Sequence, residues 1–253
     1  GKNILIDGGP STPGYDSGER VIAPFLRHKG IRKIDTVILS HPQNDHAGGL
    51  AFILKNFRVN RIIGVHHRDI PIPIHRKLRA IASEKRVDYQ PGKPGSISAE
   101  DRTSEPHLYE VEILNPIDTN FTDFSQSSLN NNSIVLKLRF GRISFLFTGD
   151  IETPAEYAML HSGADLQADI LKAPHHGSVT SSSKAFLNAV NPVFAVISAS
   201  ERNRFNFPSE AVLRRYKQRG VKLLQTSKSG AITIVTDGRR VWVKTVIPDS
   251  LTF

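Results

Sequence analysis

The sequence contains no cysteine among its 253 residues. Disulfide bonds and cysteine-ligated zinc sites are therefore excluded, and any bound metal must be held by histidine, carboxylate or amide groups. The chain also lacks a run approaching the roughly 20 apolar residues that a membrane-spanning helix needs, and no signal peptide is visible. As supplied, it is expected to be soluble.

Acidic residues are fewer than basic ones, with 24 Asp and Glu against 33 Lys and Arg, for a net charge of +9. This surplus favours polyanionic partners such as nucleic acid or an anionic membrane. Many basic proteins bind no nucleic acid, so the charge alone does not decide the function. An initiator methionine is also missing, and Gly1 leads within three residues into an apolar run. We therefore expect a piece of a longer protein.

Short apolar runs alternate with helical patterns, which is typical of a layered α/β fold. The length fits one domain over 1–253, or at most two small ones. Strands are predicted at 4–7, 36–39, 61–65, 110–114, 134–140, 143–147, 170–172, 193–197, 222–225, 231–235 and 241–245. Helices are predicted at 20–29, 49–57, 74–85, 154–161, 183–190 and 208–219, and loops at 90–107 and 118–132. Gly30 and Gly220 follow two of the helices, where a left-handed cap residue is favoured.

The segment SHPQNDHAGG places His41, Asp45 and His46 directly after the strand predicted at 36–39. Open α/β sheets carry their sites at the carboxyl ends of strands, and paired glycines allow a tight turn into the next helix. A metal site held by a loop is one interpretation. The alternative is that Asp45 caps the helix and His41 bonds a carbonyl.

Two further predicted strands end in residues that can ligate a metal. Asp150 follows the strand at 143–147, and His175 and His176 follow the strand at 170–172. Asp150 could instead cap the next helix. Because adjacent side chains diverge, we expect one histidine of the pair to ligate and the other to contact phosphate or support a ligand. Three strands that all end in this way favour the metal interpretation.

The segments ILIDGGP, LSHPQNDHAGG, NNNSIVLKLRFGRISFLFTGD, LKAPHHGS and VISASERNRFNFPSEAVL occur in that order. From Ile4 to about Val235 the chain thereby resembles the metallo-β-lactamase-like domain of ComEC-type competence proteins, membrane channels that admit DNA into bacteria. The resemblance implies a four-layer αβ/βα sandwich with a metal site at one edge. The family's opening strand with a VGQGD-like turn is missing here, so the sandwich is expected to lack its first strand or strands.

Two positions depart from the family pattern. Gln43 replaces an aspartate of H-x-D-x-D-H, and Phe207 replaces the histidine of N-R-Y-G-H-P. A glutamine carbonyl oxygen can ligate hard cations but carries no charge, so it binds more weakly than a carboxylate. The predicted ligands are His41, Gln43, Asp45, His46, Asp150 and His175. They suffice for one ion, and the neutral Gln43 weakens the case for a second. Nitrogen and oxygen donors admit Mn²⁺ and Zn²⁺, and the resemblance favours Mn²⁺.

Cationic and hydroxyl side chains near this set are candidates for DNA binding. Lys172 precedes the histidine pair, Ser178 follows it, and Arg202 and Arg204 come after the strand at 193–197. Such groups bind phosphates without reading sequence. Phe205 and Phe207 could stack a base, although aromatics more often close a core edge, which we favour for Phe207.

The function predicted is a metal-dependent phosphodiesterase that hydrolyses DNA during uptake. Metal-activated water would attack phosphorus near Asp45, while His176 or Lys172 stabilises charge in the transition state. The resemblance implies a location on the extracytoplasmic face of the bacterial inner membrane, with the channel portion of the same polypeptide as partner and no small-molecule cofactor. One alternative is a degenerate domain that binds DNA without cutting it. Another is a small-molecule metallohydrolase, which the basic surplus disfavours.

Overall fold

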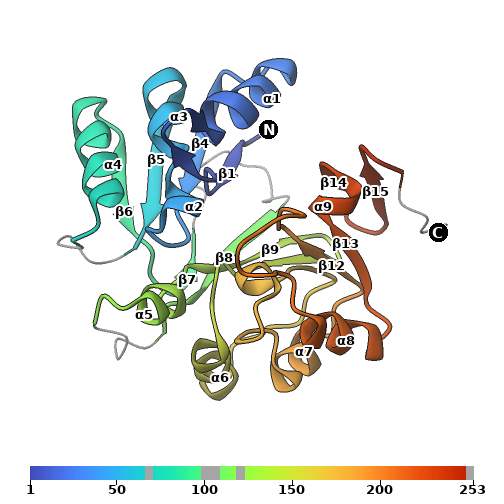
Figure 1. Cartoon of the computed structure of the whole chain (residues 1–253). Helices are drawn as coiled ribbons and strands as arrows, with labels where there is room; N and C mark the ends of the chain where they lie inside the picture. The colour runs from blue at the N-terminus through green and yellow to red at the C-terminus, as the bar shows by residue number, and fades with distance from the viewer. Residues whose placement is uncertain (66–70, 98–108, 118–122, 249–253) are drawn as a thin grey trace. The chain divides into compact units, whose positions relative to one another are not determined.

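A computed structural model of the chain describes residues 1–65, 71–97, 109–117 and 123–248 (Figure 1). The chain divides into two compact units, one formed by 1–93 and 120–134 and the other by 94–119 and 135–253. Both contain strands and helices, which confirms the predicted α/β class. That residues 1–253 form a single domain remains a prediction. No helix within the described ranges is long and apolar enough to cross a membrane.

The first unit is built on a parallel four-stranded sheet in the order β1-β4-β5-β6. Its strands are β1 (Ile4–Ile6), β4 (Lys33–Ile38), β5 (Arg58–Gly64) and β6 (Asp88–Pro91). Parallel strands are usually apolar and covered by helices, and the buried Val37, Ile38 and Ile62 follow this rule. All four strands point the same way, so β1 and β4 bring the residues that follow them to one edge.

Helices bury one apolar stripe each in the core of the first unit. They are η1 (Gly18–Ile22), α1 (Ala23–His28), α3 (Leu50–Asn56) and α4 (Pro73–Glu84). Leu50, Ile53 and Leu54 are spaced to share a helix face and are buried, as are Leu78 and Ile81 of α4. This packing anchors α3, and with it the glycine turn that precedes it.

The second unit contains a seven-stranded sheet in the order β13-β12-β11-β10-β9-β8-β7. Its strands are β7 (Gly95–Ser96), β8 (Tyr109–Asn115), β9 (Val135–Phe140), β10 (Ile143–Phe147), β11 (Ile170–Lys172), β12 (Phe194–Ile197) and β13 (Lys222–Gln225). β10 pairs antiparallel with β9 and parallel with β11. The parallel strands β10 to β12 therefore end at the same edge.

Three helices connect the parallel strands of the second unit: α6 (Thr153–Ser162), α7 (Lys184–Val190) and α8 (Glu210–Gln218). Met159, Phe186, Leu187 and Tyr216 from these helices are fully buried. The chain ends in α9 (Thr226–Ser229) and a separate hairpin of β14 (Ile232–Thr236) and β15 (Val241–Thr245).

Every strand and helix predicted from the sequence is present, with its ends shifted by at most three residues. Gly30 and Gly220 have φ of 68° and 67°, which confirms the left-handed caps. Several short elements were not predicted. They are β2 (Ser11–Thr12), β3 (Tyr15–Asp16), α2 (Asn44–Ala47), β6, β7, α5 (Gln126–Asn131), η2 (Pro174–Gly177) and α9.

The two predicted loops need correction. Helix α5 lies inside the stretch 118–132, because Ser125 caps it by accepting the backbone N–H of Ser128 at 3.2 Å. In the stretch 90–107, β6 ends at Pro91 and β7 occupies Gly95–Ser96. The remaining parts of these stretches, 98–107 and 118–122, lie outside the described residues.

Candidate metal centre

In the first unit, a tight glycine turn holds the histidine segment against the end of β1. The N–H of Gly8 donates to the carbonyl of His46 at 2.6 Å. A Cβ at Gly49 would collide with the Gly8 carbonyl. Only glycine therefore permits this approach, which agrees with the role inferred from the sequence.

Asp7, at the end of β1, orients His46. Its Oδ2 lies 2.7 Å from Nδ1 of His46, and its Oδ1 accepts the N–H of Ser40 at 2.8 Å. Burial would raise the pKa of Asp7, but the adjacent His46, with His41 and the Ser40 N–H, holds it below the usual range. His46 thus keeps its proton on Nδ1 and presents the Nε2 lone pair, as metal-ligating histidines do.

His41 lies beside His46 in the same unit. Its side chain is 0% exposed, its Nδ1 is 3.1 Å from Oγ of Ser40, and the two imidazole centroids are 4.1 Å apart. Asp45 is exposed in the first turn of α2, next to His46. Two buried imidazoles beside a carboxylate form a donor set typical of a metal site.

Gln43 occupies the N-cap position of α2, but its side-chain nitrogen donates to Oδ1 of Asn130 in α5 at 2.9 Å. Gln43 thus links α2 to α5. Asp45 lies inside α2 rather than at its N-cap, so the geometry does not favour the interpretation of Asp45 as a helix cap.

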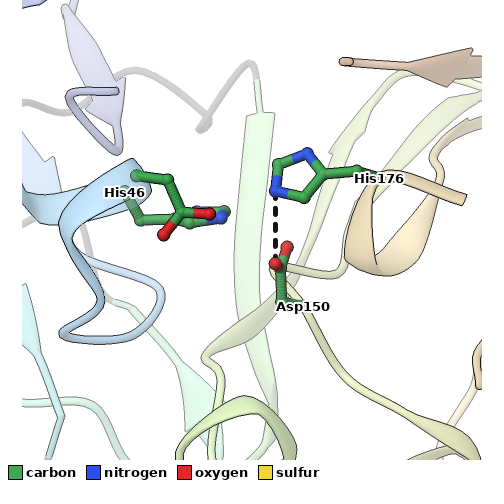
Figure 2. A group of neighbouring side chains, drawn as sticks. His46, Asp150 and His176 are labelled. Atoms are coloured by element: carbon green, nitrogen blue, oxygen red, sulfur yellow. Dashed lines mark ion pairs between the residues drawn. The ribbon is translucent and has the colours of Figure 1, made fainter. Parts of the chain in front are cut away.

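In the second unit, β10 delivers Asp150 and β11 delivers the histidine pair in η2. Asp150 is 1% exposed, and its Oδ2 lies 3.2 Å from Nε2 of His176 (Figure 2). Nδ1 of His176 lies 2.6 Å from the carbonyl oxygen of Ser198. Because a carbonyl only accepts, Nδ1 is the protonated nitrogen, and Nε2 faces the carboxylate.

His175 also reaches Asp150, with its Nε2 at 3.9 Å, while its Nδ1 lies 3.2 Å from Oε1 of Glu152. We expected the two adjacent side chains to diverge. They converge because His175 and His176 both have left-handed φ values, of 46° and 53°. The expectation assumed an extended backbone, in which successive side chains alternate.

Backbone hydrogen bonds hold the η2 turn at both ends. His175 donates its N–H to the carbonyl of Gly149 at 3.2 Å, and Gly177 accepts the N–H of Ser209 at 2.9 Å. Gly177 has a φ of 82°, and a Cβ there would lie 2.6 Å from Cβ of Pro208. Two left-handed non-glycine residues cost about 1–3 kcal/mol each, which the surrounding contacts must offset.

The other predicted site residues occupy varied places in the second unit. Nζ of Lys172 donates to the carbonyl of Ala173 at 3.0 Å. Ser178 is 3% exposed and its hydroxyl is 2.9 Å from that of Thr180, which favours a role within the turn. Arg202 and Arg204 are exposed in the segment after β12.

Three relevant residues were missed by the sequence reasoning: Asp7, Asn130 and Glu152. Asp7 was the last residue of a predicted strand in ILIDGG, the same signal that selected Asp150. Glu152 and Asn130 gave no such signal, because their partners are distant in sequence or lie in unpredicted turns.

The sequence profile of the Metallo-beta-lactamase superfamily matches residues 1–123. ComE operon protein 3 of Bacillus subtilis is 31% identical over 86% of this chain, and competence protein ComA of Neisseria gonorrhoeae is 31% identical over 91%. Ribonuclease J of Mycolicibacterium smegmatis is 26% identical over 60% of the chain.

This chain spans 26% of ComE operon protein 3, 29% of ComA and 24% of the ribonuclease. The sheets and helices are those of the predicted metallo-β-lactamase-like fold, and the identities extend over most of the chain. The chain therefore belongs to the metallo-β-lactamase superfamily and is a homologue of competence proteins.

Proposed function

We propose that this chain is a metal-dependent phosphodiesterase that hydrolyses DNA. Asp45, His46, Asp150 and His176 each offer one ligand atom, and we assign all four to one divalent ion. Metal-dependent hydrolysis is the chemistry of the superfamily, and nucleic acid as substrate is the further step taken here.

The observation that carries the proposal is the arrangement of His176 and Asp150. Nδ1 of His176 donates to the Ser198 carbonyl at 2.6 Å, while Nε2 lies 3.2 Å from Oδ2 of the buried Asp150. The lone pair of Nε2 and the carboxylate oxygen at this separation repel each other unless a proton or a metal ion lies between them. A divalent ion shared by both removes the repulsion.

The donors fit such an ion. His46 and His176 both have Nδ1 fixed by an acceptor, so both present Nε2, and the oxygen donors are carboxylates. This mixture suits Mn²⁺ or Zn²⁺. The ion would supply a Lewis acid that acidifies water and neutralises phosphate oxygens.

The residues around the ion have distinct proposed roles. The geometry favours His176 as the ligand beside Asp150. His175 is the imidazole held between Asp150 and Glu152. The sequence had predicted His175 as the ligand and His176 as the residue that stabilises charge. His175 is then the candidate for moving a proton to or from the substrate. His41 lies against His46 as a further ligand. Lys172 keeps its predicted role of neutralising phosphate charge, for which its amine must leave the Ala173 carbonyl.

The comparisons support nucleic acid as the substrate class. One relative is named as a competence protein and another as a ribonuclease. The net charge of +9 favours a polyanionic substrate. A location outside the cytoplasm, with a membrane channel as part of the same polypeptide, is part of the proposal.

A cleavage assay with metal analysis tests the function. We expect the purified chain to bind Mn²⁺ or Zn²⁺, to nick plasmid DNA with the ion, and to lose activity with chelator. Asp150→Asn should reduce cleavage by more than about a hundredfold, because it removes a ligand charge. Asp88→Asn, at an exposed position in β6, is the matched control. Unchanged cleavage by Asp150→Asn would overturn the proposal.

A DNA-binding domain without catalysis is the second candidate, and Gln43 favours it. Its amide is engaged with Asn130 where the resembled family has a carboxylate. If this substitution has silenced the centre, the wild type binds DNA without cleaving it, and Gln43→Asp should raise both metal affinity and cleavage. Nitrocefin hydrolysis without DNA cleavage would instead support the small-molecule alternative.

A further inference from the structure

The segment between β12 and α8, residues 198–209, is organised by one side chain. Oδ1 of Asn203 accepts the N–H groups of Phe205 at 3.2 Å and Phe207 at 2.9 Å. Its Nδ2 donates to the carbonyls of Ser200 at 2.9 Å and Phe207 at 2.7 Å. These four bonds fix the backbone that carries both aromatic residues.

The two phenyl rings form a continuous series of contacts with charged and titratable neighbours. Phe205 stacks on Phe207 with centroids 5.4 Å apart and an interplanar angle of 19°. Phe207 meets the imidazole of His175 edge-on at 5.5 Å. The guanidinium carbon of Arg204 lies 4.6 Å from the Phe205 centroid. The Arg204 guanidinium and the two phenyl rings thus form a series of contacts that ends at His175.

Phe205 is 53% exposed, so one face of its ring is open to a ligand. Phe207 is half-buried, in line with its predicted role at a core edge, whereas Phe205 is exposed. A ring held at the surface beside an arginine is the arrangement with which single-strand binding proteins stack bases.

We propose that Arg204, Phe205 and Phe207 form a base-stacking ledge that seats an unpaired nucleobase beside His175. This inference rests on the proposed function, since it places the base next to the proposed centre. A paired base has both faces covered by its neighbours, so it cannot use the ledge without being unstacked. The ledge would therefore give the protein a preference for single-stranded over duplex DNA.

Binding without catalysis tests the ledge directly. The probe is fluorescein-labelled oligo(dT), with a hairpin duplex of equal charge as the comparison, and chelator prevents cleavage. Phe205→Ala should weaken oligo(dT) binding about tenfold, the effect of one lost base-stacking contact, and should leave duplex binding unchanged. Phe205→Tyr should bind like the wild type. Phe205→Leu, which keeps apolar area without an aromatic face, should resemble Phe205→Ala.

Two further measurements, on Arg204→Lys and on the stability of each variant, support the interpretation of this assay. An equal loss for oligo(dT) and duplex, or no loss for either, would overturn the ledge. Arg204→Lys keeps the charge but removes the planar group, so it should weaken oligo(dT) binding more than duplex binding. The binding assay contains chelator and no metal ion. Its result can therefore be interpreted whatever the outcome of the Asp150→Asn cleavage assay. Unfolding curves for each variant check that the fold is retained.

Discussion

Asp7 acts on the proposed centre through His46, which it contacts at 2.7 Å. The carboxylate fixes the protonated nitrogen and makes Nε2 a stronger donor. Asp7→Asn removes the charge and allows the opposite tautomer, so we expect metal affinity to fall about 10–100-fold. Titration against a competing chelator measures this. Asp35→Asn, at another carboxylate of the same unit, controls for general destabilisation. Equal affinities for Asp7→Asn and wild type would show that Asp7 has no part in positioning His46.

His75, in α4, links the stability of the chain to pH. It is fully buried in α4, its Nε2 is 3.1 Å from the Tyr89 hydroxyl, and burial, with Arg79 nearby, lowers its pKa from 6.5 to about 4. Above about pH 6.5, His75 is neutral in both folded and unfolded chains and contributes no pH dependence. As pH falls from 6.5 towards 4, only the unfolded chain takes up the proton. Stability should therefore fall by about 3 kcal/mol in this window.

Urea unfolding at a series of pH values measures this loss. His75→Leu should flatten the profile between pH 6.5 and 4, whereas His28→Leu, at an exposed position of α1, should keep the wild-type slope. An unchanged slope in His75→Leu would assign the acid sensitivity to other groups.

Sequence reasoning located most of the candidate residues, since His41, Asp45, His46, Asp150 and the histidine pair all follow predicted strands. Strand ends can be found from local patterns, and parallel strands gather their ends at one edge. The orientation of His175 and His176 could not be predicted from the sequence. It depends on their left-handed backbone, which is held by residues distant in sequence such as Ser209.

At the scale of elements, Glu156 joins α6 to the start of α7. It is fully buried, its Oε2 accepts the N–H of Ser183 at 2.9 Å, and its other oxygen accepts that of Ser182. Burial raises its pKa despite these bonds. Glu156→Ala leaves the N–H of buried Ser182 and that of partly buried Ser183 without this acceptor, so we expect a loss of about 2 kcal/mol in unfolding free energy. Chemical denaturation measures it, with the exposed Glu84→Ala as control. A loss no larger than the control's would mean that water replaces the carboxylate.

The long elements were predictable and the short ones were not. β10 and α4 carry enough apolar residues for their period to show, with α4 burying Leu78, Ile81 and Ala82. Helix α2 has only the four residues Asn44–Ala47, and the six residues of α5 include one apolar side chain, Leu129. Their stability comes from Ser125, Gln43 and Asn130, whose contacts no local pattern contains.

At the scale of the whole molecule, the proposed ion should stabilise every element that supplies a ligand. Asp45 and His46 lie in α2, and His176 lies in η2. An ion at a hundred times its dissociation constant adds about 2.7 kcal/mol to the stability of whatever binds it. An ion bound by all four ligands should therefore protect both α2 and η2, whereas an ion bound by Asp45 and His46 alone protects only α2.

Hydrogen exchange followed by mass spectrometry distinguishes these outcomes. With Mn²⁺ we expect slower amide exchange both at α2, in the first unit, and at η2, in the second, while the hairpin β14–β15 serves as the internal reference. In Asp150→Asn the protection should disappear at both places, although α2 carries no substitution. A loss of protection at α2 is expected only if Asp150 binds the same ion as Asp45 and His46. Protection of α2 that survives in Asp150→Asn would place the ion in the first unit alone, and the assignment of four shared ligands would fail.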